Sequence, residues 1–450
     1  MKRLLLITTL LFSFLLFAQE EEKKVEFQGF LESYNGATVR DDGKILTSRS
    51  RFRLDTFYSN EKALLFGSLD AQYNDVIKEK TNVTLKEGYV LYETGKVDFK
   101  LGRQIVVWGK SDGITITDVV NPRDYTEFLT VDLDDMRLGV EAAKLRLLTE
   151  KANIELVWVP LFRPAELPLQ KDNPWRPNIN IPKGFGEYAD EVELALSEAD
   201  KFIKEDFPER NLKNSEFGAR VPIFFPNFDV SLCGFYTWDD IPAAYQIKTQ
   251  NILGAEIPEI ELLYKRVLVL GGDLSFSLGD VVVRGEGAVY AGKHIMQVDE
   301  ANVVESYNNP KFYKTNVIKS MIGFDYNSEV ITLSGQFSDD FVPDFKEDMA
   351  RDKQHNMLGT LLVGKKFFRD NFKVENKTYV DFGREALFNR INIDYAATDG
   401  LHFLLGFDLF HIWKKYKGED SNQVIKLDIN EVIAEYDRND NVWIKAKYNF

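Results

Sequence analysis

Cysteine and histidine are scarce in this chain: its 450 residues include one cysteine, Cys233, and four histidines. A lone cysteine excludes a disulfide within the chain, and the apolar strand pattern around Cys233 predicts a buried side chain. The histidines are widely spaced, and the sequence has no Gly-x-Ser-x-Gly or phosphate-loop motif. We therefore assign no catalytic residue, no metal site and no cofactor, and predict that the protein is not an enzyme.

Long apolar runs are also scarce. The one at the N-terminus, residues 4–17, follows a basic start and is shorter than the roughly 20 residues that a membrane-spanning helix needs. It predicts a signal peptide over residues 1–18, cleaved after Ala18. The formal net charge of −15 disfavours nucleic acid as a partner.

What the chain does contain is alternation of apolar and polar residues at the period of a β-strand. In the last ten residues, one face carries Val442, Ile444, Ala446, Tyr448 and Phe450, and the other carries Trp443, Lys445, Lys447 and Asn449. The first face suits lipid and the second suits water. This strand resembles the closing strand of bacterial outer-membrane β-barrels.

Similar strands recur through residues 19–450, which we predict to form a single domain. Short turns and longer connections alternate between them, as in a transmembrane barrel. We predict an all-β fold: a transmembrane antiparallel barrel of about 18 strands, with 16 as the alternative, one of the strands being 259–278. The long external connections include 111–133 and 164–214, the latter an insertion with a helical stripe over 188–207, and a further loop helix is expected near 424–436.

Charged residues on the strands indicate which face is the lumen, because a charge facing lipid at mid-membrane costs roughly 2–4 kcal/mol. On this argument the inward side chains are Arg49, Arg51, Arg53, Asp55, Arg137, Glu141, Arg284 and Glu286.

The most specific motif lies over residues 101–124. It consists of Gly102-Arg103-Gln104, then Trp108-Gly109-Lys110-Ser111, then Asn121-Pro122-Arg123-Asp124. It resembles the signature of the DUF1302 family, although an acidic residue is common there at the position of Lys110. The resemblance implies an outer-membrane barrel that moves hydrophobic compounds alongside an inner-membrane exporter.

The residues of this motif can also be interpreted physically. Arg103 shares a strand face with Leu101 and Ile105, so we expect it near the membrane interface or turned inward by a bulge. Trp108 fits an aromatic girdle, and Gly109 allows the backbone to bend. The following loop either narrows the pore, presenting Arg103, Gln104, Lys110, Arg123 and Asp124, or uses these side chains to satisfy its own backbone. The acidic stretch 132–135 lacks the pattern of a calcium loop and is expected to be solvated.

Three functions remain open. The first is a channel or transporter in the bacterial outer membrane, for a small solute or a hydrophobic compound; the charged lumen favours polar cargo and the family resemblance favours hydrophobic cargo. The second is a structural or adhesive anchor that works through its surface loops. The third is an outer-membrane hydrolase. Outer-membrane lipid is the expected surrounding, and no cargo is identified.

Overall fold

The computed structural model describes residues 25–40, 43–170, 172–177, 203–252, 255–413 and 433–450. The predicted signal peptide and most of the predicted helical stripe lie outside these residues. No helix in the described part of the chain is long and apolar enough to span a bilayer.

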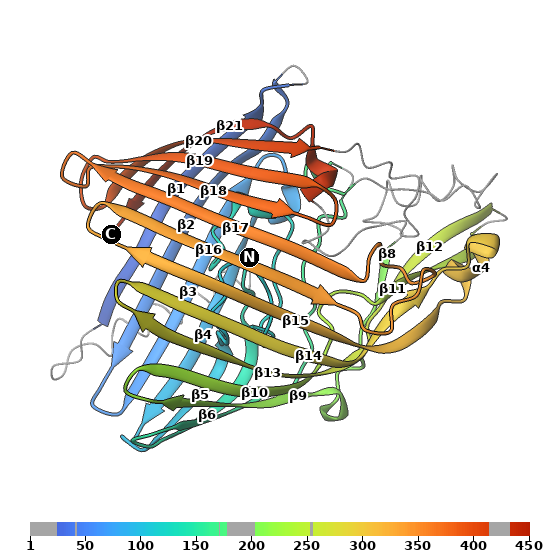
Figure 1. The fold of residues 1–450 in the computed structure, drawn as a ribbon, viewed down its shortest axis with the longest axis horizontal. Coiled ribbons are helices and arrows are strands. Elements are labelled where there is room, and N and C mark those ends of the chain that lie inside the picture. The colour runs from blue at the N-terminus through green and yellow to red at the C-terminus, as the bar shows by residue number, and fades with distance from the viewer. Residues whose placement is uncertain (1–24, 41–42, 171, 178–202, 253–254, 414–432) are drawn as a thin grey trace, which may run out of the picture.

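The prediction of an 18-stranded antiparallel barrel is confirmed (Figure 1). Each strand pairs with the next barrel strand in the chain, and β1 pairs with β21, with Phe30 opposite Asn449, so the sheet closes on itself. The barrel strands are β1 (Val25–Thr38), β2 (Ile45–Ser59), β3 (Ala63–Asn74), β4 (Asn82–Glu93), β5 (Val97–Gln104), β6 (Val140–Leu148), β7 (Asn153–Val159), β9 (Glu216–Phe224), β10 (Phe228–Trp238), β13 (Arg266–Leu278), β14 (Val281–Gln297), β15 (Lys311–Asn327), β16 (Ile331–Phe341), β17 (His355–Phe367), β18 (Phe372–Asp381), β19 (Ala386–Ala396), β20 (Leu401–Ile412) and β21 (Asn441–Asn449).

The outer face of the barrel is apolar, as the alternation predicts. In β21, Ile444 is 59% exposed whereas its neighbour Trp443 is 4% exposed and points inward. The same outward exposure recurs around the barrel in Leu31, Phe52, Leu270, Ile322 and Phe403. A belt of exposed aliphatic and aromatic side chains on a closed sheet suits a lipid environment.

A second sheet lies beyond one end of the barrel. It contains β8 (Ile203–Asp206), β11 (Ala244–Ile252) and β12 (Ala255–Leu263), and Figure 1 shows β11 and β12 beside helix α4 (Val303–Asn308). The predicted strand 259–278 is therefore wrong, because the chain leaves β12 at Leu263 and starts β13 at Arg266. The predicted helical stripe is also wrong over residues 203–206, which pair with β12.

Short 3₁₀ turns complete the secondary structure of the described residues. They are η2 (Lys78–Lys80), η3 (Phe128–Thr130), η5 (Leu212–Asn214), η6 (Glu300–Asn302) and η9 (Ile433–Tyr436). The last falls within the loop helix expected near 424–436, of which residues 424–432 lie outside the described part of the chain.

Candidate functional site across the lumen

Residues 105–139, between β5 and β6, fold into the barrel; we call them the inward segment. Its first half is apolar and packs against inward side chains that we call the apolar wall. Trp108, 1% exposed, lies with its ring centroid 5.7 Å from that of Phe235 and donates its indole N–H to Glu155 at 2.6 Å. The apolar wall consists of Val140, Ala142, Val157, Val159, Phe235, Val267, Val269, Ala288 and Val317.

One carboxylate on β14 holds this half of the segment. Glu286 accepts backbone N–H groups from Lys110 at 2.9 Å, Ser111 at 3.0 Å and Thr117 at 2.7 Å, and the Thr117 hydroxyl at 2.7 Å. Gly109 has φ of +77°, and a Cβ there would lie 2.5 Å from Glu286 Oε1. Glycine is therefore required for the segment to approach Glu286 this closely.

The second half of the segment is acidic and meets a charged wall, which we define as Arg49, Arg51, Arg53, Asp70 and Lys86. Asp135 pairs with Arg53 at 2.7 Å, with Arg51 at 3.2 Å and with Lys86. Burial alone would raise the pKa of the Asp135 carboxyl, but Lys86, Arg51 and Arg53 hold the pKa well below its usual range. The expected solvated acidic stretch is thus wrong for Asp135.

A β-bulge brings Lys86 into this wall. The pairing of β3 with β4 shifts so that Ser68 faces Glu87 while Leu69 faces Leu85. Lys86 is the extra residue, and a bulge re-aims side chains in this way. Next to it, Glu127 pairs with Arg49 and also accepts the amides of Gln72 at 3.1 Å and Asn74 at 3.2 Å.

The two walls face each other across the lumen. Counting round the ring from β2, the order β3, β4, β5, β6, β7, β9, β10, β13 and β14 places β14 nine steps away in a closed sheet of 18 strands. Contacts to Arg51 and Arg53 on β2 and to Glu286 on β14 therefore fix the inward segment at diametrically opposite points. The segment spans the lumen, which the sequence left open as one of two interpretations.

Hydrogen bonds from the Asn-Pro turn join the two ends of the inward segment. The side chain of Asn121 accepts the Val106 N–H at 2.6 Å and donates to the carbonyls of Leu138 at 2.7 Å and Gln104 at 3.2 Å. These bonds join the start of the segment to its end, next to Pro122. Gln104 is fully buried and donates to the Ala142 carbonyl at 2.8 Å, so it serves the backbone and does not line a pore.

Other predicted residues are distributed as follows. Asp118 forms ion pairs with Arg123 at 3.1 Å and with Arg137 at 2.8 Å inside the barrel. Asp124 pairs with Lys80 at 2.6 Å, and although burial opposes it, Lys80 lowers the pKa of Asp124.

Two charged residues that were predicted to face the lumen from the barrel strands are Arg284 and Asp55. Arg284 pairs with Asp112 of the segment at 2.8 Å and with Asp325 of the wall at 2.7 Å, while Lys110 reaches Ser275 at 2.5 Å. Asp55 faces inward on β2, and its Oδ1 is buried without a hydrogen bond among the described residues.

Three predicted side-chain positions are wrong, those of Arg103, Glu141 and Trp108. Arg103 pairs with Glu141 directly across β5 and β6, and because Val140 and Ala142 point into the core, both charges lie on the outer face. They are removed from the set of lumen residues. Gly102, with φ of +128°, precedes Arg103 and allows Gly88 to approach. Trp108 is not part of an outer girdle, because β5 ends at Gln104 and the chain has already turned inward.

An aromatic cluster packs against the inward side chains of β19 and β20. Phe128 of the inward segment contacts Trp175, Phe388, Phe410 and Tyr436, with its ring centroid 4.6 Å from that of Tyr436. The Tyr436 hydroxyl donates to the Trp175 carbonyl at 2.7 Å. Sequence reasoning missed this cluster because its five members come from five separate segments of the chain.

The family follows from the match of a family model described as "Protein of unknown function (DUF1302)", which covers residues 35–411. The chain belongs to the DUF1302 family. No curated protein matches this DUF1302 chain.

Solved structures similar to this DUF1302 protein are bacterial barrels of low sequence identity. A loop-deletion mutant of the outer membrane protein OmpT of Vibrio cholerae is 10% identical, with a TM-score of 0.40 and coverage of 96% of this chain and 100% of that one. Salmonella typhi OmpF, in a complex with daunomycin, is 8% identical, with a TM-score of 0.43 and coverage of 95% and 98%. Pseudomonas aeruginosa OccK11 is 7% identical, with a TM-score of 0.46 and coverage of 95% and 96%. These similarities concern the barrel architecture alone.

Proposed function

We propose that this protein is an outer-membrane channel through which a small solute passes beside the inward segment. The observation that carries the proposal is the attachment of that segment to opposite walls, which narrows the lumen at one level. The apolar outer belt supports a position in a bilayer, with lipid as the surrounding. The closed sheet leaves no open edge to satisfy there.

The lumen beyond the segment favours a polar solute. Toward the short turns, half-buried charged side chains point inward: Lys144 pairs with Glu155 at 3.4 Å, and Lys100 lies 4.0 Å from Glu87. Opposed charges along a water-accessible wall are the usual basis of solute selection in a pore. A hydrophobic compound would meet apolar wall residues only where the inward segment already covers them.

The test is single-channel recording of the refolded full-length chain in planar bilayers. We expect steady ion-selective steps, and a larger conductance for E286A, which removes four hydrogen bonds that seat the segment. The matched control is E375A, because Glu375 faces the lumen from β18 and pairs with Lys373 but not with the segment. The control should alter selectivity without enlarging the steps.

A silent bilayer would contradict the proposal if heat-modifiable gel mobility shows that the inserted protein is folded. The anchor hypothesis would then lead, because β8, β11 and β12 form a sheet beyond the barrel with an apolar core of its own around Ile260 and Leu262. Equal conductance of the wild type and E286A would instead show that the segment does not limit the current.

A further inference from the structure

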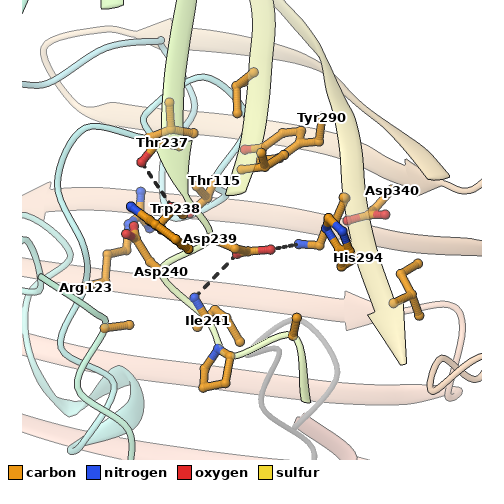
Figure 2. Close-up of a pocket in the computed structure, with 18 of the residues that line it drawn as sticks. Thr115, Arg123, Thr237, Trp238, Asp239, Asp240, Ile241, Tyr290, His294 and Asp340 are labelled. Carbon is orange, nitrogen blue, oxygen red and sulfur yellow. Dashed lines mark hydrogen bonds and ion pairs between the residues drawn. The ribbon is translucent and has the colours of Figure 1, made fainter. Parts of the chain in front are cut away.

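A cavity of about 210 Å³ lies at the loop end of the barrel (Figure 2). It is enclosed by the inward segment, the inner faces of β13–β16 and the residues that follow β10. It is separate from the contacts that tie the segment to β2 and to Glu286. The charged side chains in its lining and its position on the proposed route point to a binding site rather than a packing defect.

Three of the four carboxylates that line the cavity have cationic partners. Asp239 pairs with Lys293 at 2.9 Å, Asp118 with Arg123 at 3.1 Å, and Asp340 with Lys319 at 3.2 Å and Arg351 at 2.9 Å. The fourth is Asp240, whose carboxylate makes no hydrogen bond or ion pair within the described residues.

The surroundings of Asp240 favour a positive charge. Asp240 is half-buried, and its side chain lines the cavity. Burial raises the pKa of Asp240 well above its usual range, Glu216 and Asp239 raise it further, and Arg123 and Lys293 oppose them only in part. An ionised carboxylate in such a place needs a partner to offset its desolvation.

The ion pair between Lys293 and Asp239 forms because a β-bulge turns Lys293 toward the cavity. The pairing of β14 with β15 shifts between Tyr290 and Lys293, and Gly292 adopts φ of +72°. Without this bulge, strict alternation from the inward Tyr290 would turn Lys293 away from the lumen. The bulge aims Lys293 at Asp239. Figure 2 shows Asp240 on the side of Arg123, with no dashed line to its carboxylate.

Aromatic rings line the same cavity as this carboxylate. Trp238 precedes Asp239 and Asp240, and Tyr245 and Tyr307 stack with their ring centroids 5.1 Å apart. Aromatic faces attract organic cations and pack against flat apolar groups. A carboxylate among aromatic rings is a combination that recognises an amine on a small organic body.

We propose that this cavity binds a small organic amine, with its ammonium group on Asp240 and its apolar body against Trp238 and the two tyrosines. The inference deepens the proposed function, since it names a solute class for the same passage and rests on that function for its biological use. Binding itself is measurable without transport, so the two proposals fail separately.

The test is isothermal titration calorimetry of the folded full-length protein in detergent with three probes of similar size. Benzylammonium carries the charge, benzyl alcohol is its neutral counterpart, and benzoate carries the opposite charge. We expect saturable binding of benzylammonium alone. D240N should weaken it roughly tenfold or more, whereas D240E should retain binding.

D344N is the matched control. Asp344 is exposed in the loop between β16 and β17, so this variant removes the same charge at the same end of the barrel, outside the cavity. It should bind benzylammonium as the wild type does. Heat-modifiable mobility on gels establishes that each variant is folded before titration.

Three results would overturn the inference. They are equal binding of benzylammonium by D240N and the wild type, tighter binding of benzoate than of benzylammonium, and loss of binding in D344N. The second would assign the cavity to anions held by Arg123 and Lys293. Binding of the amine by a protein that carries no current would keep this inference and contradict the channel.

Discussion

The apolar wall and the charged wall hold the same inward segment by different physics. On the apolar side, Trp108 and its neighbours exclude water, and such packing responds little to salt or pH. On the charged side, Asp135 is held by Arg51, Arg53 and Lys86, and ionic contacts weaken with screening and with protonation. From this difference we expect the segment to move more readily at the charged wall than at the apolar wall.

The largest expected loss of stability comes from removing the packing of the inward segment against the apolar wall. W108A removes a side chain that is 1% exposed and leaves the Glu155 carboxylate without its indole donor. We expect a loss of about 3–5 kcal/mol in the free energy of unfolding, measured by urea titration with gel mobility as the readout. The loss should not change with added salt. W108F, which retains most of the ring volume, should lose less, and an equal loss would assign the effect to the hydrogen bond.

Removing the ion pairs between the inward segment and the charged wall should lower the free energy of unfolding by less. D135N removes the carboxylate shared by Arg51, Arg53 and Lys86 and leaves Asp70 to pair with the two arginines, at a cost of about 3 kcal/mol. Conductance should rise, because the acidic half of the segment loses its tie. D134N is the matched control, since the Asp134 side chain is 98% exposed and, of the residues that the structure describes, it pairs with Arg137 alone. Unchanged conductance in D135N would place the moving part elsewhere.

Protonation of Asp135 at low pH should raise the conductance as D135N does, by a smaller amount. Because the folded-state pKa of Asp135 lies below its ordinary value, its stabilisation is fully present above roughly pH 4 and is lost as the pH falls further. We expect wild-type conductance to increase on acidification below about pH 4, and the D135N current to change less. Parallel titration of the two proteins in bilayers checks this, and identical pH profiles would exclude Asp135 as the titrating group.

The smallest predicted effect is a gain in stability rather than a loss, in the variant D240N. Asp240 has a raised pKa in the folded state, so as the pH rises above its unfolded pKa of roughly 4, ionisation favours the unfolded chain. D240N removes this penalty and should stabilise the barrel by about 1 kcal/mol at neutral pH. Urea titration at pH 7 and below pH 4 measures the gain, which should vanish at the lower pH. A destabilised D240N would show that the carboxylate has a structural partner.

Sequence patterns predicted the barrel well because alternation reports which residues face lipid. The inward positions of Arg49, Arg51, Arg53 and Glu286 follow from the cost of a charge in a bilayer. The same argument failed at Glu141, because Arg103 lies directly opposite and the two charges neutralise each other on the outer face. A rule about single charges cannot detect a cross-strand pair until the register is known.

The site was less accessible to sequence reasoning. Lys86 and Lys293 reach their partners through β-bulges, and a bulge reverses the alternation on which the reasoning depends. Asp240 follows a strand directly and carries no motif. The clearest available signal was the division of residues 106–137 into an apolar half and an acidic half, which corresponds to the two walls.

The pairing of β1 with β21 has a consequence for assembly. The strands that close the ring come from opposite ends of the printed sequence, so the last seam requires the longest loop closure of the whole sheet. Once that seam forms, the inward segment can enter only through the loop end of the barrel, whereas before closure it can also fold against the open sheet. We therefore expect its apolar half, which follows β5 in the chain, to pack against neighbouring strands before the seam closes.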